Sequence, residues 1–166
     1  MGVACEEAVL VAAACNDGLC NEGPRPCIAF YPASWPFVIG VMAESSSPSL
    51  KGEWLARFSN WDNVPSSRIE YEMMAPGVQI YSTLPEGKYA AWNGTSMAAP
   101  VAAGVAALVR TKYSEKNTYS SRFIMGQVTS TGSSKIGKAP EGKRPISYPS
   151  LDGESALSKV PKPELG

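Results

Sequence analysis

Residues 96–113 constrain the fold of this chain more than any other segment, because they are rich in alanine and in small side chains. Alanine has the highest intrinsic helix propensity, and Pro100 lies near the start of the segment, where a proline is tolerated. Ala103, Gly104 and Ala107 are small enough to let a neighbouring element approach closely. The segment therefore predicts a packed central helix.

Two short apolar runs predict strands of a sheet. Residues 8–14 are continuously apolar and stop at Asn16-Asp17-Gly18, and residues 37–42 form the second run. An unbroken apolar run with a sharp stop is typical of a strand that is buried on both faces, as in a parallel sheet. Together with the helix, these runs predict an α/β fold.

A hairpin and a second helix complete the predicted elements. Residues 78–82 and 89–92 flank a turn that contains proline and glycine, and this order predicts a β-hairpin. The second helix is expected over residues 119–128, with Thr118 as its N-cap. After Gly132 the chain turns polar and rich in lysine, proline and glycine.

The charge balance and the histidine content restrict the classes of function. Lys plus Arg and Asp plus Glu both number 15, so we expect neither nucleic acid nor a membrane surface as partner. No apolar stretch is long enough to span a bilayer. The chain contains no histidine, the residue with which most serine hydrolases take the proton from the serine hydroxyl. A hydrolase of that kind could not be completed with the residues of this chain alone.

Four cysteines lie at positions 5, 15, 20 and 27. A zinc site is disfavoured, since the spacing has no Cys-x-x-Cys pair and no histidine could complete the ligands. A disulfide between Cys20 and Cys27 would close a short loop in a secreted protein. Partly buried free thiols are the other interpretation, and the sequence leaves the two open.

The string Asn93-Gly94-Thr95-Ser96, followed by Met-Ala-Ala-Pro, joins the predicted hairpin to the predicted helix. A hydroxyl at a helix N-terminus lies beside unpaired backbone N–H groups and the positive end of the helix dipole. Such donors can stabilise the anion that develops when the hydroxyl acts as a nucleophile. A bare Gly-Thr-Ser would be interpreted as a helix cap alone, and the two roles are compatible.

The longer string closely resembles the serine signature of the subtilisin family, Gly-Thr-Ser-x-Ala/Ser-x-Pro followed by small residues. The resemblance implies that Ser96 is the nucleophile. Residues 9–18, VLVAAACNDG, resemble the buried strand of that family, which ends at an asparagine of the oxyanion hole. Asn16 falls on that asparagine, while Cys15 replaces the glycine that usually precedes it. The resemblance covers residues 8–128, with a weaker match over residues 148–157.

The resemblance also implies a fold and further site residues. The expected fold is a partial subtilisin-like three-layer fold, with parallel strands, a C-terminal hairpin and a central helix that starts at the catalytic serine. Asp17 would lie at the rim of the primary specificity pocket. The residues expected to bind substrate are Ala13, Ala14, Phe30, Asn93, Gly94 and Thr95. No cofactor is required, and calcium is the candidate structural ion, bound by backbone carbonyls of Ala33, Trp35 and Val38.

The aspartate and histidine of the subtilisin triad precede the oxyanion asparagine, so the resemblance implies that the chain lacks the upstream half of the domain. Residues 1–157 would be the C-terminal half of a catalytic domain, and residues 158–166 a disordered tail. Three interpretations stay open: a protease fragment, a catalytically dead binding or regulatory module, and one half of a split protease. The expected partners are a polypeptide substrate and the missing N-terminal half, in cis or in trans. The location would be extracellular if a signal has been lost, and otherwise cytoplasmic.

Overall fold

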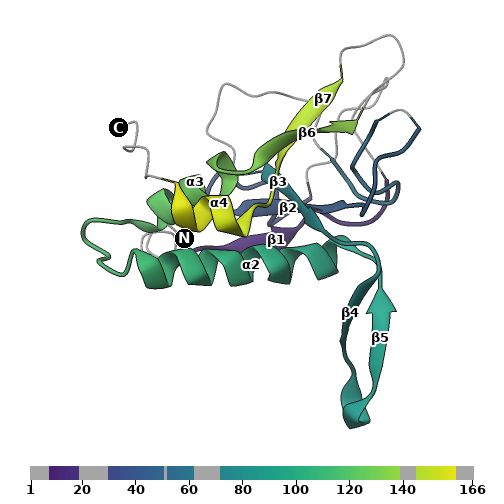
Figure 1. Ribbon diagram of the computed structural model, residues 1–166, viewed down its shortest axis with the longest axis horizontal. Helices are drawn as coiled ribbons and strands as arrows, with labels where there is room; N and C mark the ends of the chain where they lie inside the picture. Colours follow the sequence, from purple (N-terminus) through teal and green to yellow (C-terminus); the bar gives the residue numbers. More distant parts are fainter. Residues whose placement is uncertain (1–7, 19–29, 51, 62–71, 139–144, 160–166) are drawn as a thin grey trace.

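A mainly parallel sheet forms the centre of the computed structural model, which describes residues 8–18, 30–50, 52–61, 72–138 and 145–159 (Figure 1). Its strands lie in the order β1-β2-β3-β7-β6. The first three contacts along this order are parallel, and β6 pairs antiparallel with β7. The strands are β1 Val11–Ala13, β2 Ile39–Glu44, β3 Glu72–Pro76, β6 Ser133–Lys138 and β7 Ile146–Ser150.

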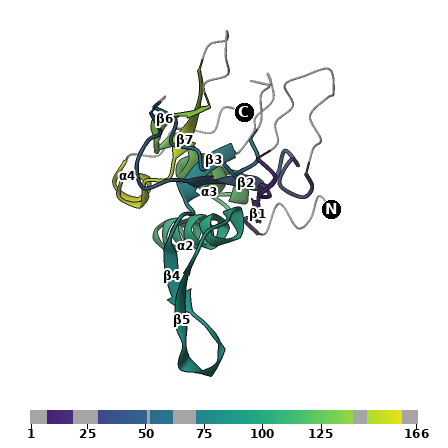
Figure 2. The same cartoon turned by 90° about the vertical axis from the view of Figure 1, so that its right-hand side faces the viewer.

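The predicted hairpin is present as β4 Ile80–Thr83 and β5 Tyr89–Trp92, which pair antiparallel as a separate two-stranded sheet. A single 3-10 turn, η1 Pro85–Gly87, lies at its tip. Figures 1 and 2 show that the hairpin projects away from the central sheet on the side of α2. The chain returns from the tip along β5 and enters α2, so the hairpin delivers the predicted serine motif to the start of the helix.

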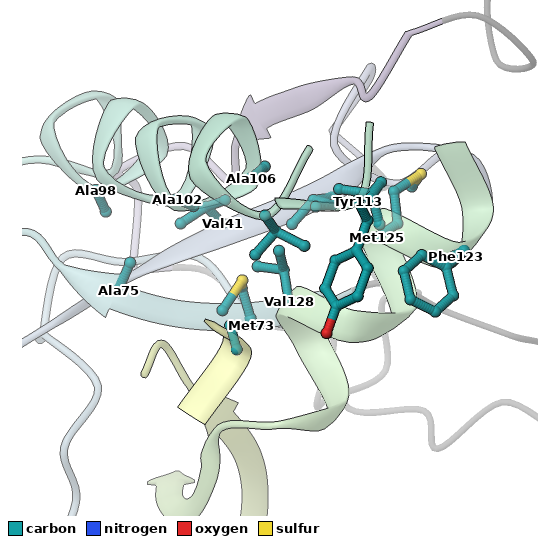
Figure 3. Packing of buried hydrophobic residues seen from close by; sticks show 14 residues of the cluster. Val41, Met73, Ala75, Ala98, Ala102, Ala106, Tyr113, Phe123, Met125 and Val128 are labelled. Atoms are coloured by element: carbon teal, nitrogen blue, oxygen red, sulfur yellow. The ribbon is translucent and has the colours of Figure 1, made fainter. Parts of the chain in front are cut away.

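The predicted central helix is confirmed as α2 Thr95–Lys112, which packs on the sheet with one face. Ala98, Ala102 and Ala106 are buried at helical spacing, and they face Val41 of β2 and Met73 and Ala75 of β3 in the main core (Figure 3). Helices α3 Ser121–Ser130 and α4 Gly153–Ser158 complete this core. A second cluster, which contains Met42, Leu55, Met74 and Tyr148, packs apart from the main core.

The opposite face of α2 is open to solvent. We call it the outer face of α2, and it consists of Ser96, Pro100, Ala103, Gly104, Ala107 and Leu108, all exposed. Leu108 is 56% exposed, and nothing lies within 4 Å of a β-carbon built on Gly104. A helix that is apolar on all sides is normally buried on all sides, so this face is unusual for a protein surface.

Strand β1 was expected to be buried on both faces, and the structure contradicts this expectation. Its three residues are only half-buried, whereas all six of β2 are buried. The reason is that β1 is the edge strand among the described strands and pairs with β2 alone. An apolar strand with one free edge offers backbone N–H and C=O groups to a further strand.

The second helix starts later than the sequence predicted. Helix α3 begins at Ser121, and Ser120, not Thr118, is its N-cap, because Ser120 Oγ accepts a hydrogen bond from Phe123 N at 3.1 Å. Strands β6 and β7 and helix α4 lie in the polar region that suggested no elements. Helix α4 ends at Ser158, and residues 160–166 of the predicted tail lie outside the described residues. None of the described helices has the length and apolarity needed to cross a bilayer.

Candidate active site

The turn between β5 and α2 is packed closely against the sheet. Gly94 N donates a hydrogen bond to Gly77 O at 2.8 Å, which joins the turn to the end of β3. A β-carbon on Gly77 would lie 2.6 Å from Ala43 Cβ and 2.9 Å from Gly94 O. Glycine at position 77 is therefore required for this approach, and it fixes the position at which α2 begins.

Thr95 orients the side chain of Asn16. The Asn16 Oδ1 atom accepts hydrogen bonds from Thr95 N at 2.8 Å and from Thr95 Oγ1 at 3.0 Å. A backbone N–H can only donate, so the oxygen of the Asn16 amide must face Thr95 and its nitrogen must face away. Thr95 is fully buried, while Asn16 and Ser96 are exposed. The amide nitrogen of Asn16 thus points out of the core.

The amide nitrogen of Asn16 and the backbone nitrogen of Ser96 lie beside the same space. A β-carbon built on Gly94 would be 3.7 Å from each of these two nitrogens and 3.2 Å from Met97 Sδ. Among the described residues, no hydrogen bond uses Asn16 Nδ2 or Ser96 N. Two N–H donors that converge at an exposed serine residue are chemically suited to stabilise a developing oxyanion.

No base is bound to the serine hydroxyl within the described residues. The chain contains no histidine, and no hydrogen bond or ion pair among the described residues joins Ser96 Oγ to a charged side chain. A serine hydroxyl without a base is a weak nucleophile. The described residues thus bring together two N–H donors and the serine residue, and no hydrogen bond among them joins Ser96 Oγ to a base.

The other residues expected to bind substrate lie near this turn or on β1. Ala13 and Ala14 are half-buried at the end of β1, so they flank the turn that carries Asn16. Asn93 is exposed, and its Oδ1 accepts a hydrogen bond from Gln79 N at 2.6 Å, which closes the base of the hairpin. Phe30 is half-buried, and its carbonyl accepts a hydrogen bond from Ser34 N at 3.0 Å. The roles of these residues in substrate binding stay predictions.

The carbonyls suggested for calcium lie in one stretch of turns before β2. Trp35 O already accepts a hydrogen bond from Val38 N at 3.0 Å, and Ala33 O lies 2.8 Å from a β-carbon built on Gly40. No group of three His, Cys, Asp or Glu side chains in the described part of the chain could hold a metal ion. Backbone ligation of calcium by Ala33, Trp35 and Val38 stays a prediction.

Cys15 is the one cysteine within the described residues, and it is a half-buried free thiol. Its φ angle is 77°, in the left-handed region that favours glycine. Cysteines 5, 20 and 27, and with them the disulfide considered above, lie outside the described residues.

The structure gives two residues contacts at the site that the sequence did not predict. Thr95 was expected to contact substrate, but its described hydrogen bonds orient Asn16. Asn60 was not among the expected site residues, and it forms hydrogen bonds to the turn that carries Asn16. A buried asparagine needs partners for its amide, and the structure places these partners 43 positions away in the sequence.

Comparison with known proteins places the chain in a family. A family model described as "Subtilase family" matches residues 2–137. Subtilisin E of Bacillus subtilis (strain 168) is 45% identical over 105 residues, which cover 63% of this chain and 24% of that protein. Subtilisin DY of Bacillus licheniformis is 42% identical over 123 residues, which cover 74% of this chain and 39% of that protein.

A solved structure has a similar fold. The patellamide maturation protease PatA superimposes with a TM-score of 0.67 at 26% identity, covering 90% of this chain and 50% of that one. The chain thus spans less than two-fifths of the curated relatives named above and half of the matched solved chain.

Proposed function

Because the chain belongs to the subtilase family of serine endopeptidases, we propose that it supplies the nucleophile and the oxyanion donors of a peptide-bond hydrolase. The observation that carries this proposal is the convergence of Asn16 Nδ2 and Ser96 N on the space beside Gly94, at the exposed residue that carries the serine hydroxyl. Because no residue of the chain is a histidine, the base must come from outside it. The substrate class is a polypeptide.

The steps of the reaction assign a role to each group. Ser96 Oγ attacks the carbonyl carbon of the scissile bond and passes its proton to the external base. The carbonyl oxygen takes the negative charge, and Asn16 Nδ2 and Ser96 N donate hydrogen bonds to it. The C–N bond then breaks, the amine leaves with the proton from the base, and an acyl ester remains on Ser96. Water hydrolyses the ester by the same route.

The second part of the proposal is that the upstream half of a subtilase domain, in cis or in trans, covers the outer face of α2 and the free edge of β1. Ser96 is the first residue of the outer face, so any element that covers this face also reaches the serine. Among the described strands, β1 pairs with β2 alone, so its other edge offers backbone groups to a strand of the same partner. The matched relatives are two to four times as long as the aligned region, which leaves chain enough for such a half.

Labelling with a fluorophosphonate probe tests the proposal, with Ser96→Ala as the control variant. The isolated chain should not label measurably, because no base activates Ser96. In the producing organism, the Ser96 peptide should be recovered with the probe attached. Rapid labelling of the isolated chain would contradict the need for an external base. Failure to recover labelled Ser96 peptide from an organism that makes the protein would favour the alternative, a catalytically dead binding or regulatory module.

A further inference from the structure

The turn that carries Asn16 is bound on both sides by one buried residue, Asn60. The Asn60 side chain is 4% exposed. Its backbone N donates to Cys15 O at 3.0 Å, and its Oδ1 accepts from Asp17 N at 3.0 Å. Its Nδ2 donates to Asp17 Oδ2 at 3.4 Å. Asn60 therefore contacts the residue before Asn16 and the residue after it, while the Asn16 side chain bonds to Thr95.

The segment that carries Asn60 is itself fixed to the sheet. Ser59 Oγ accepts a hydrogen bond from Ala43 N of β2 at 3.0 Å and donates one to Asn60 O at 3.0 Å. Phe58 O accepts a hydrogen bond from Gly18 N at 2.7 Å, which extends the same contact along the turn. Ser59 is 1% exposed, so these bonds are shielded from water. The position of the turn is thus set by β2 through residues 58–60.

The turn needs such a restraint because its backbone is strained. Cys15 adopts a φ of 77°, which costs on the order of 1 kcal/mol or more for a residue with a β-carbon and persists only where the surroundings enforce it. Without the bonds from Asn60, residue 15 would relax toward negative φ and turn the Asn16 side chain. A shift of about 1 Å in a catalytic group is enough to lower a rate by about a hundredfold.

We propose that Asn60 is a positioning residue for the oxyanion donor, acting through the backbone on either side of Asn16. The catalytic consequence rests on the proposed function, whereas the mechanical consequence does not. Thr95 orients the amide of Asn16, and Asn60 places the backbone from which that amide extends. The two contacts are independent, so loss of either one misplaces the donor.

Asn60→Asp tests this with little change in shape. The carboxylate can still accept from Asp17 N, but it faces the Asp17 carboxylate in place of donating to it, and two like charges repel. The double variant Asn60→Asp/Asp17→Asn restores a donor and an acceptor in reversed order. Val128→Ala is the matched control, because it removes volume from the core at a fully buried position on α3, outside the site.

Hydrogen exchange of the isolated chain is the first measurement. In the wild type, the amides of Asp17 and Gly18 should exchange at least about a hundredfold more slowly than free amides, although both residues are exposed. Asn60→Asp should speed them at least about tenfold, the double variant should restore them, and Val128→Ala should leave them slow. Unprotected amides in the wild type, or equal rates in Asn60→Asp, would overturn the proposal. The exchange rates of the wild-type chain test the proposal even if a variant does not fold, because unprotected amides would show that the turn is not restrained.

Kinetics of the complete enzyme are the second measurement. Asn60→Asp should lower kcat about ten- to a hundredfold with KM within about twofold, since the donor acts in the transition state. Asn60→Asp should not lower kcat further in an Asn16→Ala background, because both substitutions remove the same interaction, the hydrogen bond from Asn16 to the oxyanion. Additive losses would show that Asn60 acts by another route. Absence of hydrolysis by the wild type would refute the proposed function alone, since hydrogen exchange still tests the contact.

Discussion

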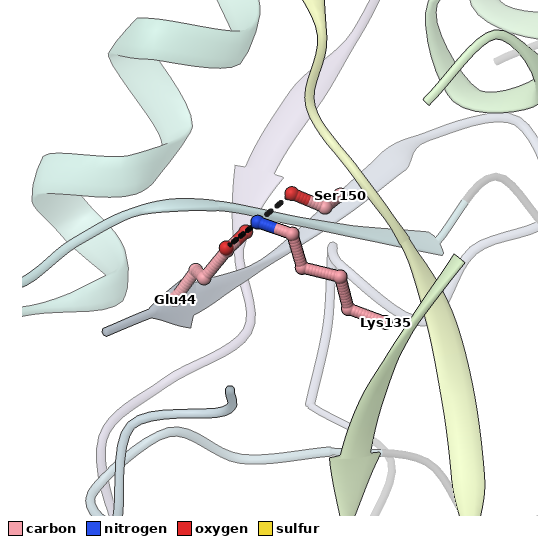
Figure 4. Close-up of polar contacts among 3 residues, drawn as sticks. All are labelled: Glu44, Lys135 and Ser150. Carbon is pink, nitrogen blue, oxygen red and sulfur yellow. Dashed lines mark hydrogen bonds and ion pairs between the residues drawn. The ribbon is translucent and has the colours of Figure 1, made fainter. Parts of the chain in front are cut away.

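The buried ion pair of Glu44 and Lys135 predicts an asymmetric response to mutation. Glu44 is the last residue of β2, and its side chain is 6% exposed, whereas that of Lys135 on β6 is 28% exposed. The carboxylate accepts hydrogen bonds from Lys135 Nζ and, at 2.5 Å, from Ser150 Oγ (Figure 4). Lys135 Nζ also lies 4.2 Å from the centroid of the Trp54 ring. The pair therefore connects β2 to β6 and β7.

Lys135→Met keeps much of the apolar stem but leaves the Glu44 carboxylate buried without its cation. Removing one partner of a fully buried pair costs about 3–5 kcal/mol. Because Lys135 is more than a quarter exposed, water can enter its place, and we expect a loss of about 2 kcal/mol. Glu44→Gln keeps an acceptor for Ser150 and leaves the more exposed partner unpaired, so we expect about 1 kcal/mol. The double variant buries no charge and should be more stable than Lys135→Met.

Urea unfolding followed by circular dichroism measures these differences. Lys88→Met is the matched control, because Lys88 pairs with Glu86 where both side chains are exposed, and it should change stability by less than about 0.5 kcal/mol. If Lys135→Met unfolds at the wild-type midpoint, the carboxylate does not need its cation. If the losses of the two single variants add in the double variant, the groups do not interact. Either result would refute the reasoning.

Three further predictions concern the backbone and one helix cap. Cys15→Gly should unfold at a higher urea concentration than Cys15→Ala, since only glycine relieves the φ of 77°; equal midpoints would show that residue 15 is not strained. Gly77→Ala should cost about 1–3 kcal/mol in the same assay, because its β-carbon would lie 2.6 Å from Ala43 Cβ; an unchanged midpoint would place the turn farther from β2. Hydrogen bonds from Ser155 lower the pKa of Asp152, so the cap stabilises α4 above the usual aspartate pKa and is lost as pH falls through the lowered value. The protection factors of the α4 amides, which correct for the intrinsic pH dependence of exchange, should decrease on acidification in the wild type, and Asp152→Asn should abolish that decrease.

The elements that the sequence predicted correctly are those whose cause is local. Alanine content determines α2, and a turn with proline and glycine determines the β4–β5 hairpin, so neither depends on distant residues. The site motif is local too, since Gly94, Thr95 and Ser96 are adjacent. The sequence could not show that Thr95 faces inward and donates a hydrogen bond to Asn16, because the two residues are 79 positions apart.

The elements that the sequence missed depend on tertiary contacts. Thr118 and Ser120 are both good N-cap residues, and the structure selects Ser120 because Phe123 packs between Tyr113 and Tyr119, with ring centroids 5.2 and 4.8 Å apart. The polar sequence of β6 is typical of a loop, but the segment forms a strand because it pairs with β7. Strand β7 in turn pairs with β3 at a single position, Met74 with Ser150. Period and propensity carry no information on such pairings.

The proposed division of the site, with the oxyanion donors in this chain and the base outside it, follows from the different geometric needs of the two groups. On the proposed function, oxyanion donors need fixed positions, and bonds within the chain fix the groups proposed for this role: Thr95 to Asn16, Asn60 to the turn, and Gly94 to Gly77. A base needs only to reach the serine hydroxyl, which lies exposed at the start of the outer face of α2. The proposed donors would therefore be preorganised before any base arrives, and electrostatic preorganisation is usually the larger part of the catalytic effect. A partner that covers the outer face of α2 would complete the centre by adding one group, without having to rebuild the donors.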